Sequence, residues 1–380
     1  MKNAWALVGL FVFALTGNAA EKQLKIRLVS DPTTFDWNRA HTDVETYVLM
    51  NIMEGLVEFD SKMKVKPLLA ESWTVSEDQK TYTFKLRKDV KWSDGKALTA
   101  DDFVASWQRL LAPLTAAPYA YMLYDIDGAE AYNSKKLADF SQVGIKALSP
   151  TSLQIRLRRP VAYFIQMLTF WVTFPIRQDV IDKFGPSWSQ PGKVVVLGPF
   201  LPAAYKPQSE IVLKRNPLYH GTKPDLDSVL MRIINEDSTA LNLFKSGGLD
   251  FVRPVNFLEL SDLKTSPQLH TAPYFRTCFL NVNTSKYPLN LPKARQALSM
   301  GVDRSKIGAV LHREMTSADS LMDDTLFPAG KGTVISFDGA RGAKLLKEAV
   351  GDPKALPKLE LVTFATDENA LLSQFIQDQL

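Results

Sequence analysis

Cysteine is almost absent from this chain: Cys278 is the only one in 380 residues. A single cysteine excludes an intrachain disulfide and a paired-cysteine redox or zinc site. Cys278 lies in the apolar stretch "YFRTCFLNVN" (274–283), which favours a strand with a buried, inert thiol. The fold must therefore be stabilised by its apolar core, and the length is sufficient for two or three domains.

Signatures of catalysis and of metal binding are also missing. The four histidines, at 41, 220, 270 and 312, share no metal-ligand spacing, and there is no HExxH motif or acid-rich calcium loop. No G-x-S-x-G is present, although counting residues leaves a serine–histidine–aspartate site open. "AGKGTVIS" (329–336) lacks the G-K-[ST] ending of a phosphate loop. The sequence predicts no metal, no cofactor and no catalytic residue.

Neither sign of charge dominates, because the chain has 45 basic and 41 acidic residues and a net charge of +4. The basic residues form no block, which argues against nucleic acid as a partner. The one long apolar run, Ala4–Leu15, is too short to cross a bilayer and is followed by small residues up to Ala20. This pattern predicts a secretory signal peptide over residues 1–20.

Strands and helices are expected in every part of the mature chain, which predicts a mixed α/β fold. Alternating or apolar patterns predict strands at 24–30, 151–160, 210–216 and 358–366, and a hairpin within 72–88. Helical spacing predicts helices at 44–56, which Thr42 and Asp43 can cap, and at 291–311 and 367–380. The stretch 238–252 is predicted to be a helix, a Gly-Gly turn and a strand.

The segment Lys91–Leu110, "KWSDGKALTADDFVASWQRL", is the most suggestive of an active site. Its two acids, Asp101 and Asp102, follow Thr99, which is placed as the N-cap of an amphipathic helix. Adjacent acids on a helix diverge by about 100°, so they do not converge on one substrate atom as an acid/base pair must. We therefore expect this segment to be structural.

A family resemblance comes from several stretches whose order and spacing are specific together. They are "NIMEGLVEFD", "PLLAESWTVSEDQKTYTFKLRKDVKWSDGKALTADDFVASWQRL", "APYAYML", "LKRNPLYH", "KSGGLDF" and "KARQALSMGVDRSKI". Their arrangement resembles the bacterial extracellular solute-binding proteins of family 5, which are the periplasmic binding proteins of peptide ABC transporters. Within that family the chain is most similar to the oligopeptide-binding group.

The resemblance implies a two-lobed periplasmic binding protein of type II, in the large-ligand class with an extra inserted domain. Lobe I would comprise 21–53 and 178–275, the inserted domain 54–177, and lobe II would begin at 276. Because the last helix reaches Leu380 without a stop signal, we expect a truncated chain with an incomplete second lobe. In relatives, the acid that anchors the ligand's amino group comes from a part of lobe II that would lie beyond Leu380.

The resemblance also implies which residues line the ligand cleft. His41 and Thr42 follow the first strand, at a place where relatives carry an acid in the position of His41. Tyr119 matches an aromatic residue that packs on the ligand, and the stretch 252–256 supplies further cleft groups. The expected ligand-binding residues are His41, Thr42, Tyr119, Arg253, Pro254, Val255, Phe279 and Asn281. A ligand carboxylate is the expected partner of Arg253.

The expected function is that of a monomeric, non-enzymatic periplasmic protein that encloses an oligopeptide by lobe closure and delivers it to the ABC permease in the inner membrane. Within this class, the alternatives are another solute (a dipeptide, a murein peptide or a metal chelate) and a truncated remnant that binds nothing. A secreted hydrolase is the alternative from a different class.

Overall fold

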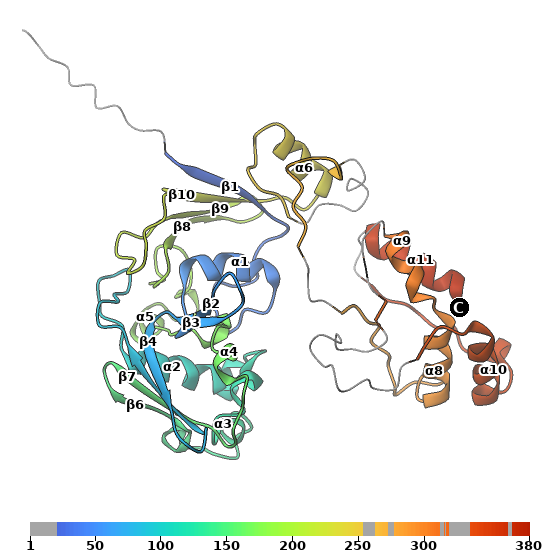
Figure 1. Cartoon of the computed structure of the whole chain (residues 1–380), viewed down its shortest axis with the longest axis horizontal. Coiled ribbons are helices and arrows are strands. Elements are labelled where there is room, and N and C mark those ends of the chain that lie inside the picture. The colour runs from blue at the N-terminus through green and yellow to red at the C-terminus, as the bar shows by residue number, and fades with distance from the viewer. Residues whose placement is uncertain are drawn as a thin grey trace, which may run out of the picture. The chain divides into compact units, whose positions relative to one another are not determined.

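The structure is a computed structural model that describes residues 21–253, 263–272, 277–311, 315, 317–318, 335–363 and 367–380. The chain divides into two compact units, Met1–Arg253 and Pro254–Leu380 (Figure 1). The expected signal peptide, and the expected site residues Pro254 and Val255, lie outside the described residues. The expected division into lobes and an inserted domain stays a prediction.

The first unit contains a four-stranded mixed sheet with the order β1-β10-β9-β8 (Figure 1). Its strands are β1 (Gln23–Leu28), β8 (Phe200–Lys206), β9 (Glu210–Arg215) and β10 (Ser228–Ile233). β1 pairs in parallel with β10, whereas the other two pairs are antiparallel. The sheet therefore joins residues 23–28 to residues some 200 positions later, and these lie in the two ranges expected to form one lobe.

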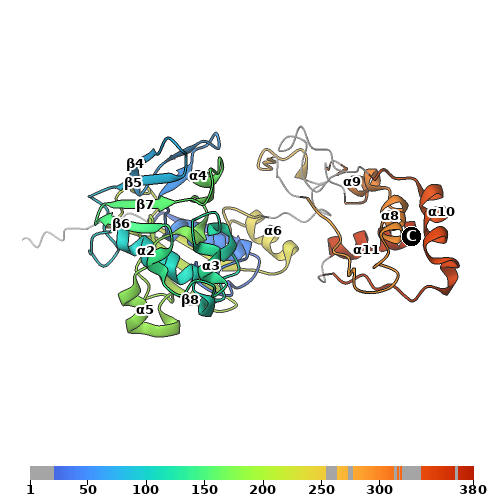
Figure 2. The ribbon, with the colours of Figure 1, turned by 90° about the horizontal axis from the view of Figure 1, so that it is seen from below.

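A second sheet in the same unit is antiparallel throughout, with the order β4-β5-β7-β6. Its strands are β4 (Ala70–Val75), β5 (Thr81–Leu86), β6 (Ile145–Ser149) and β7 (Ser152–Arg156), and a small pair is formed by β2 (Val57–Phe59) and β3 (Val65–Pro67). The hairpin expected within 72–88 is confirmed as β4 and β5. Helix α2 (Ala100–Leu111) packs against β6 and β7 (Figure 2).

The other helices of the first unit are α1 (Asp43–Ile52), α3 (Ala129–Asn133), α4 (Phe164–Met167), α5 (Gln178–Phe184) and α6 (Asp237–Lys245). One continuous core lies among them, and Trp37, Trp92 and Trp107 are fully buried in it. Core residues come from 28–53, from 56–176 and from 180–231. These ranges are therefore packed together around one apolar interior.

Helices are the main regular elements in the described parts of the second unit. They include α8 (Pro292–Gly301), α9 (Ile307–Val310), α10 (Gly339–Val350) and α11 (Asp367–Gln379). Helices α8 and α10 lie side by side (Figures 1 and 2). Gly342 allows this approach, because a Cβ there would lie 2.9 Å from the Ala297 carbonyl oxygen. The helix expected over 291–311 is interrupted at Val302 and Asp303.

Two strand predictions in the second unit were wrong. The described parts of the expected strands, 277–283 and 358–363, contain no strand. Cys278, which was expected to be buried, is exposed. The apolar side chains of Phe279 and Val362 in these two segments are exposed as well. An alternating pattern forms a strand only when a neighbouring segment completes its hydrogen bonds, and the described residues provide no such neighbour here.

Candidate ligand-binding site

The loop before α1 is held by a buried carboxylate. Glu45 Oε2 accepts hydrogen bonds from the backbone N–H groups of His41 (2.7 Å) and Thr42 (2.8 Å). Glu45 Oε1 accepts from the backbone N–H and the hydroxyl of Thr33. Burial acts to raise the pKa of Glu45, but the hydrogen bonds from Thr33, Thr42 and His41 prevail and lower it. The carboxylate is therefore ionised at neutral pH and fixes the loop.

Two predicted site residues lie on this loop and have different surroundings. Thr42 is half-buried and is the N-cap of α1, as predicted, with its hydroxyl 3.5 Å from the Glu45 backbone N–H. His41 is exposed, and its Nδ1 lies 3.4 Å from the carbonyl oxygen of Arg39. The Thr42 side chain is thus engaged by the helix, whereas the His41 imidazole is presented at the surface.

Tyr119 lies in a cluster of aromatic rings beside this loop. Its half-buried ring meets Phe170 edge-on at 5.2 Å and Trp171 at 6.0 Å. Trp171 Nε1 donates a hydrogen bond to the Ala40 carbonyl oxygen (3.4 Å), so the loop and Tyr119 meet through Trp171. Burial, followed by the charges of Tyr121, Asp43 and Glu45, raises the pKa of Tyr119. Its hydroxyl therefore remains a hydrogen-bond donor at neutral pH.

Arg253 reaches the exposed face of α1. Its Nη1 donates to the Tyr47 hydroxyl, and its guanidinium lies 5.7 Å from the centre of the Tyr47 ring. Tyr47 is one turn after the exposed Asp43, and α1 packs against the short helical turn Trp171–Thr173. We use the name α1 site for Asp43 and Tyr47 on α1, His41 on the loop before it, Arg253 in contact with Tyr47, and Tyr119, which lies within reach of the Asp43 charge.

The α1 site unites three of the predicted residues with two that the sequence did not single out. His41, Tyr119 and Arg253 were predicted, whereas Asp43 and Tyr47 were not. Their spacing of four residues on a helix was an available signal for a shared face. The predicted residues Phe279 and Asn281 belong to the second unit, where both are exposed.

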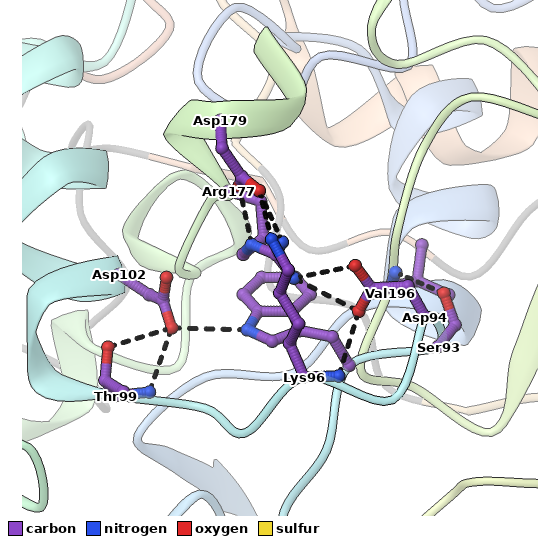
Figure 3. Close-up of polar contacts among 9 residues, drawn as sticks. Ser93, Asp94, Lys96, Thr99, Asp102, Arg177, Asp179 and Val196 are labelled. Carbon is purple, nitrogen blue, oxygen red and sulfur yellow. Dashed lines mark hydrogen bonds and ion pairs between the residues drawn. The ribbon is translucent and has the colours of Figure 1, made fainter. Parts of the chain in front are cut away.

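The segment Lys91–Leu110 is held in the fold by polar contacts, which Figure 3 shows. Asp102 accepts hydrogen bonds from Trp92 Nε1 (3.2 Å) and from the Thr99 backbone N–H (2.9 Å). Burial raises the pKa of Asp102, and these hydrogen bonds oppose the rise. Asp101 is exposed, so the two acids face different surroundings. Asp102 therefore holds Trp92 and Thr99 at the start of α2, in keeping with the structural role that the sequence predicts for this segment.

The same segment is tied to α5 by a buried arginine (Figure 3). Arg177 contacts both oxygens of Asp94, at 3.1 and 3.0 Å, and both oxygens of Asp179, each at 2.7 Å. Its guanidinium also lies over the Trp92 ring. Lys96 adds a further contact to Asp179 (2.6 Å). Every charged group in this network thus has a protein partner, which is typical of scaffold rather than of a reaction centre.

Two surface depressions of the first unit lie away from the α1 site. One, of about 320 Å³, is lined by residues that include Tyr124, Glu130 and Arg158. The other, of about 460 Å³, is lined by residues that include Asp31 and Asn235. Within the described residues, no group of three or more His, Cys, Asp and Glu side chains is arranged to hold a metal ion. None of the described helices is both long and apolar enough to cross a bilayer.

The family model for the bacterial extracellular solute-binding proteins, family 5, matches residues 64–380. The chain belongs to this family. Family 5 proteins are substrate-binding components of transporters. The matched range contains Tyr119, Arg253 and the whole of Lys91–Leu110, so the resemblance expected from short stretches holds for most of the chain.

Two curated family relatives differ in the ligands that their names give. The periplasmic oligopeptide-binding protein OppA of Escherichia coli is 35% identical over 296 residues, which are 76% of this chain and 54% of OppA. The probable deoxycholate-binding periplasmic protein YgiS of the same organism is 32% identical over 334 residues, which are 87% of this chain and 61% of YgiS. The chain thus spans little more than half the length of these relatives.

A solved structure confirms the fold class. The crystal structure of a periplasmic oligopeptide-binding protein (OppAIV) from Borrelia burgdorferi matches 94% of this chain, with a TM-score of 0.88 and 30% sequence identity. The match covers 73% of that protein. The chain therefore has the α/β fold of the type II periplasmic peptide-binding proteins over the part that it spans.

Proposed function

We propose that this chain is the periplasmic substrate-binding component of an ABC importer, and that it binds oligopeptides in extended form. Family membership and the similarity to OppA support this proposal. In this function, closure of two lobes buries the ligand and forms the surface that a membrane permease recognises. Export through a cleaved signal peptide over residues 1–20, a monomeric state and the absence of catalysis are parts of the same proposal.

The observation that carries the proposal is the aromatic setting of Tyr119. Its ring is supported by Phe170 and Trp171, and its hydroxyl is a hydrogen-bond donor at neutral pH. A supported ring with a polar end suits a ligand that presents both apolar surface and backbone carbonyls. Peptides of any sequence have such carbonyls, so backbone hydrogen bonds give affinity without strict sequence preference.

A second candidate ligand is an apolar organic carboxylate of the kind named for YgiS. The α1 site offers a specific reason to include it, because the Arg253 cation and the aromatic ring of Tyr119 both adjoin α1. An amphipathic anion would place its carboxylate on the arginine and its apolar body on the rings. A hydrolase is disfavoured, since the acid pair of Lys91–Leu110 is structural.

Calorimetric titration of the 380-residue protein tests the proposal. We expect a mixture of tripeptides to pentapeptides to bind, and mass spectrometry to recover the peptides intact. Tyr119→Ala should weaken this binding by about tenfold, because one desolvated aromatic contact is lost. Tyr132→Ala is the matched control, since Tyr132 is also half-buried and packs edge-on against a phenylalanine, Phe140.

The competing candidates give different results in the same experiment. Binding of deoxycholate without binding of peptides would replace the peptide proposal by the organic-carboxylate one. Cleaved peptides would show an enzyme. A folded protein that binds neither kind of ligand would contradict the proposal.

A further inference from the structure

The backbone just before Arg253 is held against strand β1. The N–H of Asp250 donates to the Lys25 carbonyl oxygen (2.8 Å), and Phe251 forms a parallel bridge with Ile26. The chain is therefore attached to the edge of β1 two residues before Arg253. This attachment brings the arginine to α1, although it lies more than 200 residues away in the sequence from Asp43 and Tyr47.

The side chain of Arg253 is also oriented. Tyr47 accepts a hydrogen bond from the guanidinium and supports it with the face of its ring. An arginine loses considerable rotamer freedom when it binds a ligand, and contacts that hold it beforehand reduce this loss. A planar guanidinium held in this manner matches the two oxygens of a carboxylate.

The charges around Arg253 are arranged along one helix face. Asp43, whose carboxylate is exposed, precedes Tyr47 by one turn of α1. Asp43 thus lies about 6 Å of helix rise before Tyr47, the residue that contacts Arg253. A ligand carboxylate is attracted to the Arg253 end and repelled by Asp43, so its position on the face is defined.

We propose that Arg253, positioned by Tyr47, determines specificity by recognising a carboxylate on the bound peptide. This inference rests on the proposed function and adds the chemical class of ligand that the α1 site prefers. The carboxylate belongs either to an acidic side chain or to the peptide's C-terminus. A lysine or arginine side chain at the same position is rejected by the guanidinium.

Calorimetry with four tripeptides tests this inference: Ala-Glu-Ala, Ala-Gln-Ala, Ala-Lys-Ala and Ala-Glu-Ala amide. We expect carboxylate recognition to be worth about tenfold in affinity. If the side chain is recognised, Ala-Glu-Ala binds more tightly than Ala-Gln-Ala, and Ala-Lys-Ala binds worst. If the C-terminus is recognised, amidation causes the loss instead.

Variants assign the effect to the proposed residues. Arg253→Gln should abolish the preference, and Tyr47→Leu should reduce the preference while Tyr47→Phe, which keeps the ring, retains part of it. The ratio of the affinities is the readout, since a merely structural defect would weaken all four peptides alike. Arg156→Gln is the control, because Arg156 is an exposed arginine on β7 whose charge is paired with Asp127.

The outcomes separate this inference from the proposed function. Equal affinities for all four tripeptides in the unmodified protein would overturn the carboxylate inference and leave peptide binding intact. An unchanged preference in Arg253→Gln would also overturn it. Failure of the folded protein to bind these four tripeptides and the mixture of longer peptides would overturn both.

Discussion

Asp101 and Asp102 are sequence neighbours whose surroundings are opposite. Asp101 faces solvent at the start of α2, whereas Asp102 lies against Trp92 and accepts the Thr99 backbone N–H. The same helical geometry that separates the two carboxylates prevents them from acting on one substrate atom. At the scale of single residues, this segment therefore stabilises the fold.

Substitution of these two acids should give unequal losses of stability. Asp102→Ala leaves the Trp92 and Thr99 donors without their acceptor and should lower the free energy of unfolding by about 1–3 kcal/mol. Asp101→Ala, the matched control, should change it by less than ~0.5 kcal/mol. Urea unfolding measures both values, and equal losses would contradict the assignment. Neither substitution should alter peptide affinity in either direction.

The sequence was informative about some site residues and not about others, and the reason is physical. Thr42 was predicted as an N-cap from its local pattern, and its neighbours in sequence suffice to make it one. The contact of Trp171 with Ala40 joins residues 131 positions apart, and no local pattern encodes it. The spacing of Asp43 and Tyr47 predicts that they share a helix face, but the contact of Tyr47 with Arg253, 206 positions later, is likewise not encoded locally.

At the scale of elements, Arg177 joins α5 to the turn that precedes α2. Its side chain is only 6% exposed, while its partners Asp94 and Asp179 are 32% and 51% exposed. Hydrogen bonds from Arg177, reinforced by Lys96, hold the pKa of Asp179 well below its usual range. A carboxyl whose pKa is lowered in the folded state stabilises the protein above its unfolded pKa and loses that contribution as the pH falls.

This network predicts a pH dependence that one substitution should reduce. The Asp179 contribution is complete above about pH 5 and declines as the pH falls through the acid range below the unfolded pKa of about 3.9. Arg177→Met should destabilise the protein at pH 7 and flatten this acid-side decline. Thermal unfolding between pH 3 and pH 7 measures both effects.

Lys96→Met provides the control for the pH experiment. Lys96 is 62% exposed, so solvent screens its interaction with Asp179 and its removal should have a smaller effect. Parallel pH profiles for the unmodified protein and for Arg177→Met would contradict the role of the network.

The predictions of elements were accurate where the signals were local. The hairpin of β4 and β5 and the helices α1, α2 and α11 follow directly from spacing, caps and turn residues. The strands expected at 274–283 and 358–366 are absent from the described residues of those ranges. Strand formation depends on a pairing partner from elsewhere, which an alternating pattern alone does not specify.

At the scale of the whole molecule, family membership is the firmest result. The fold match extends over 94% of the chain, while the chain spans only 54% of the E. coli OppA that it resembles. Within Met1–Arg253, the rings of Phe170 and Trp171 support Tyr119, and Tyr47 contacts Arg253. We propose that these residues take part in binding oligopeptides.

Native mass spectrometry of the purified 380-residue protein, mixed with equimolar tripeptides to pentapeptides, is the most direct test of that claim. We expect one intact peptide bound per protein molecule, with acidic peptides enriched over basic ones if Arg253 recognises a side-chain carboxylate. We also expect Tyr119→Ala and Arg253→Gln to reduce the bound fraction relative to Tyr132→Ala and Arg156→Gln. A folded protein without bound peptide, or with bound peptide that neither substitution affects, would contradict this role of the α1 site.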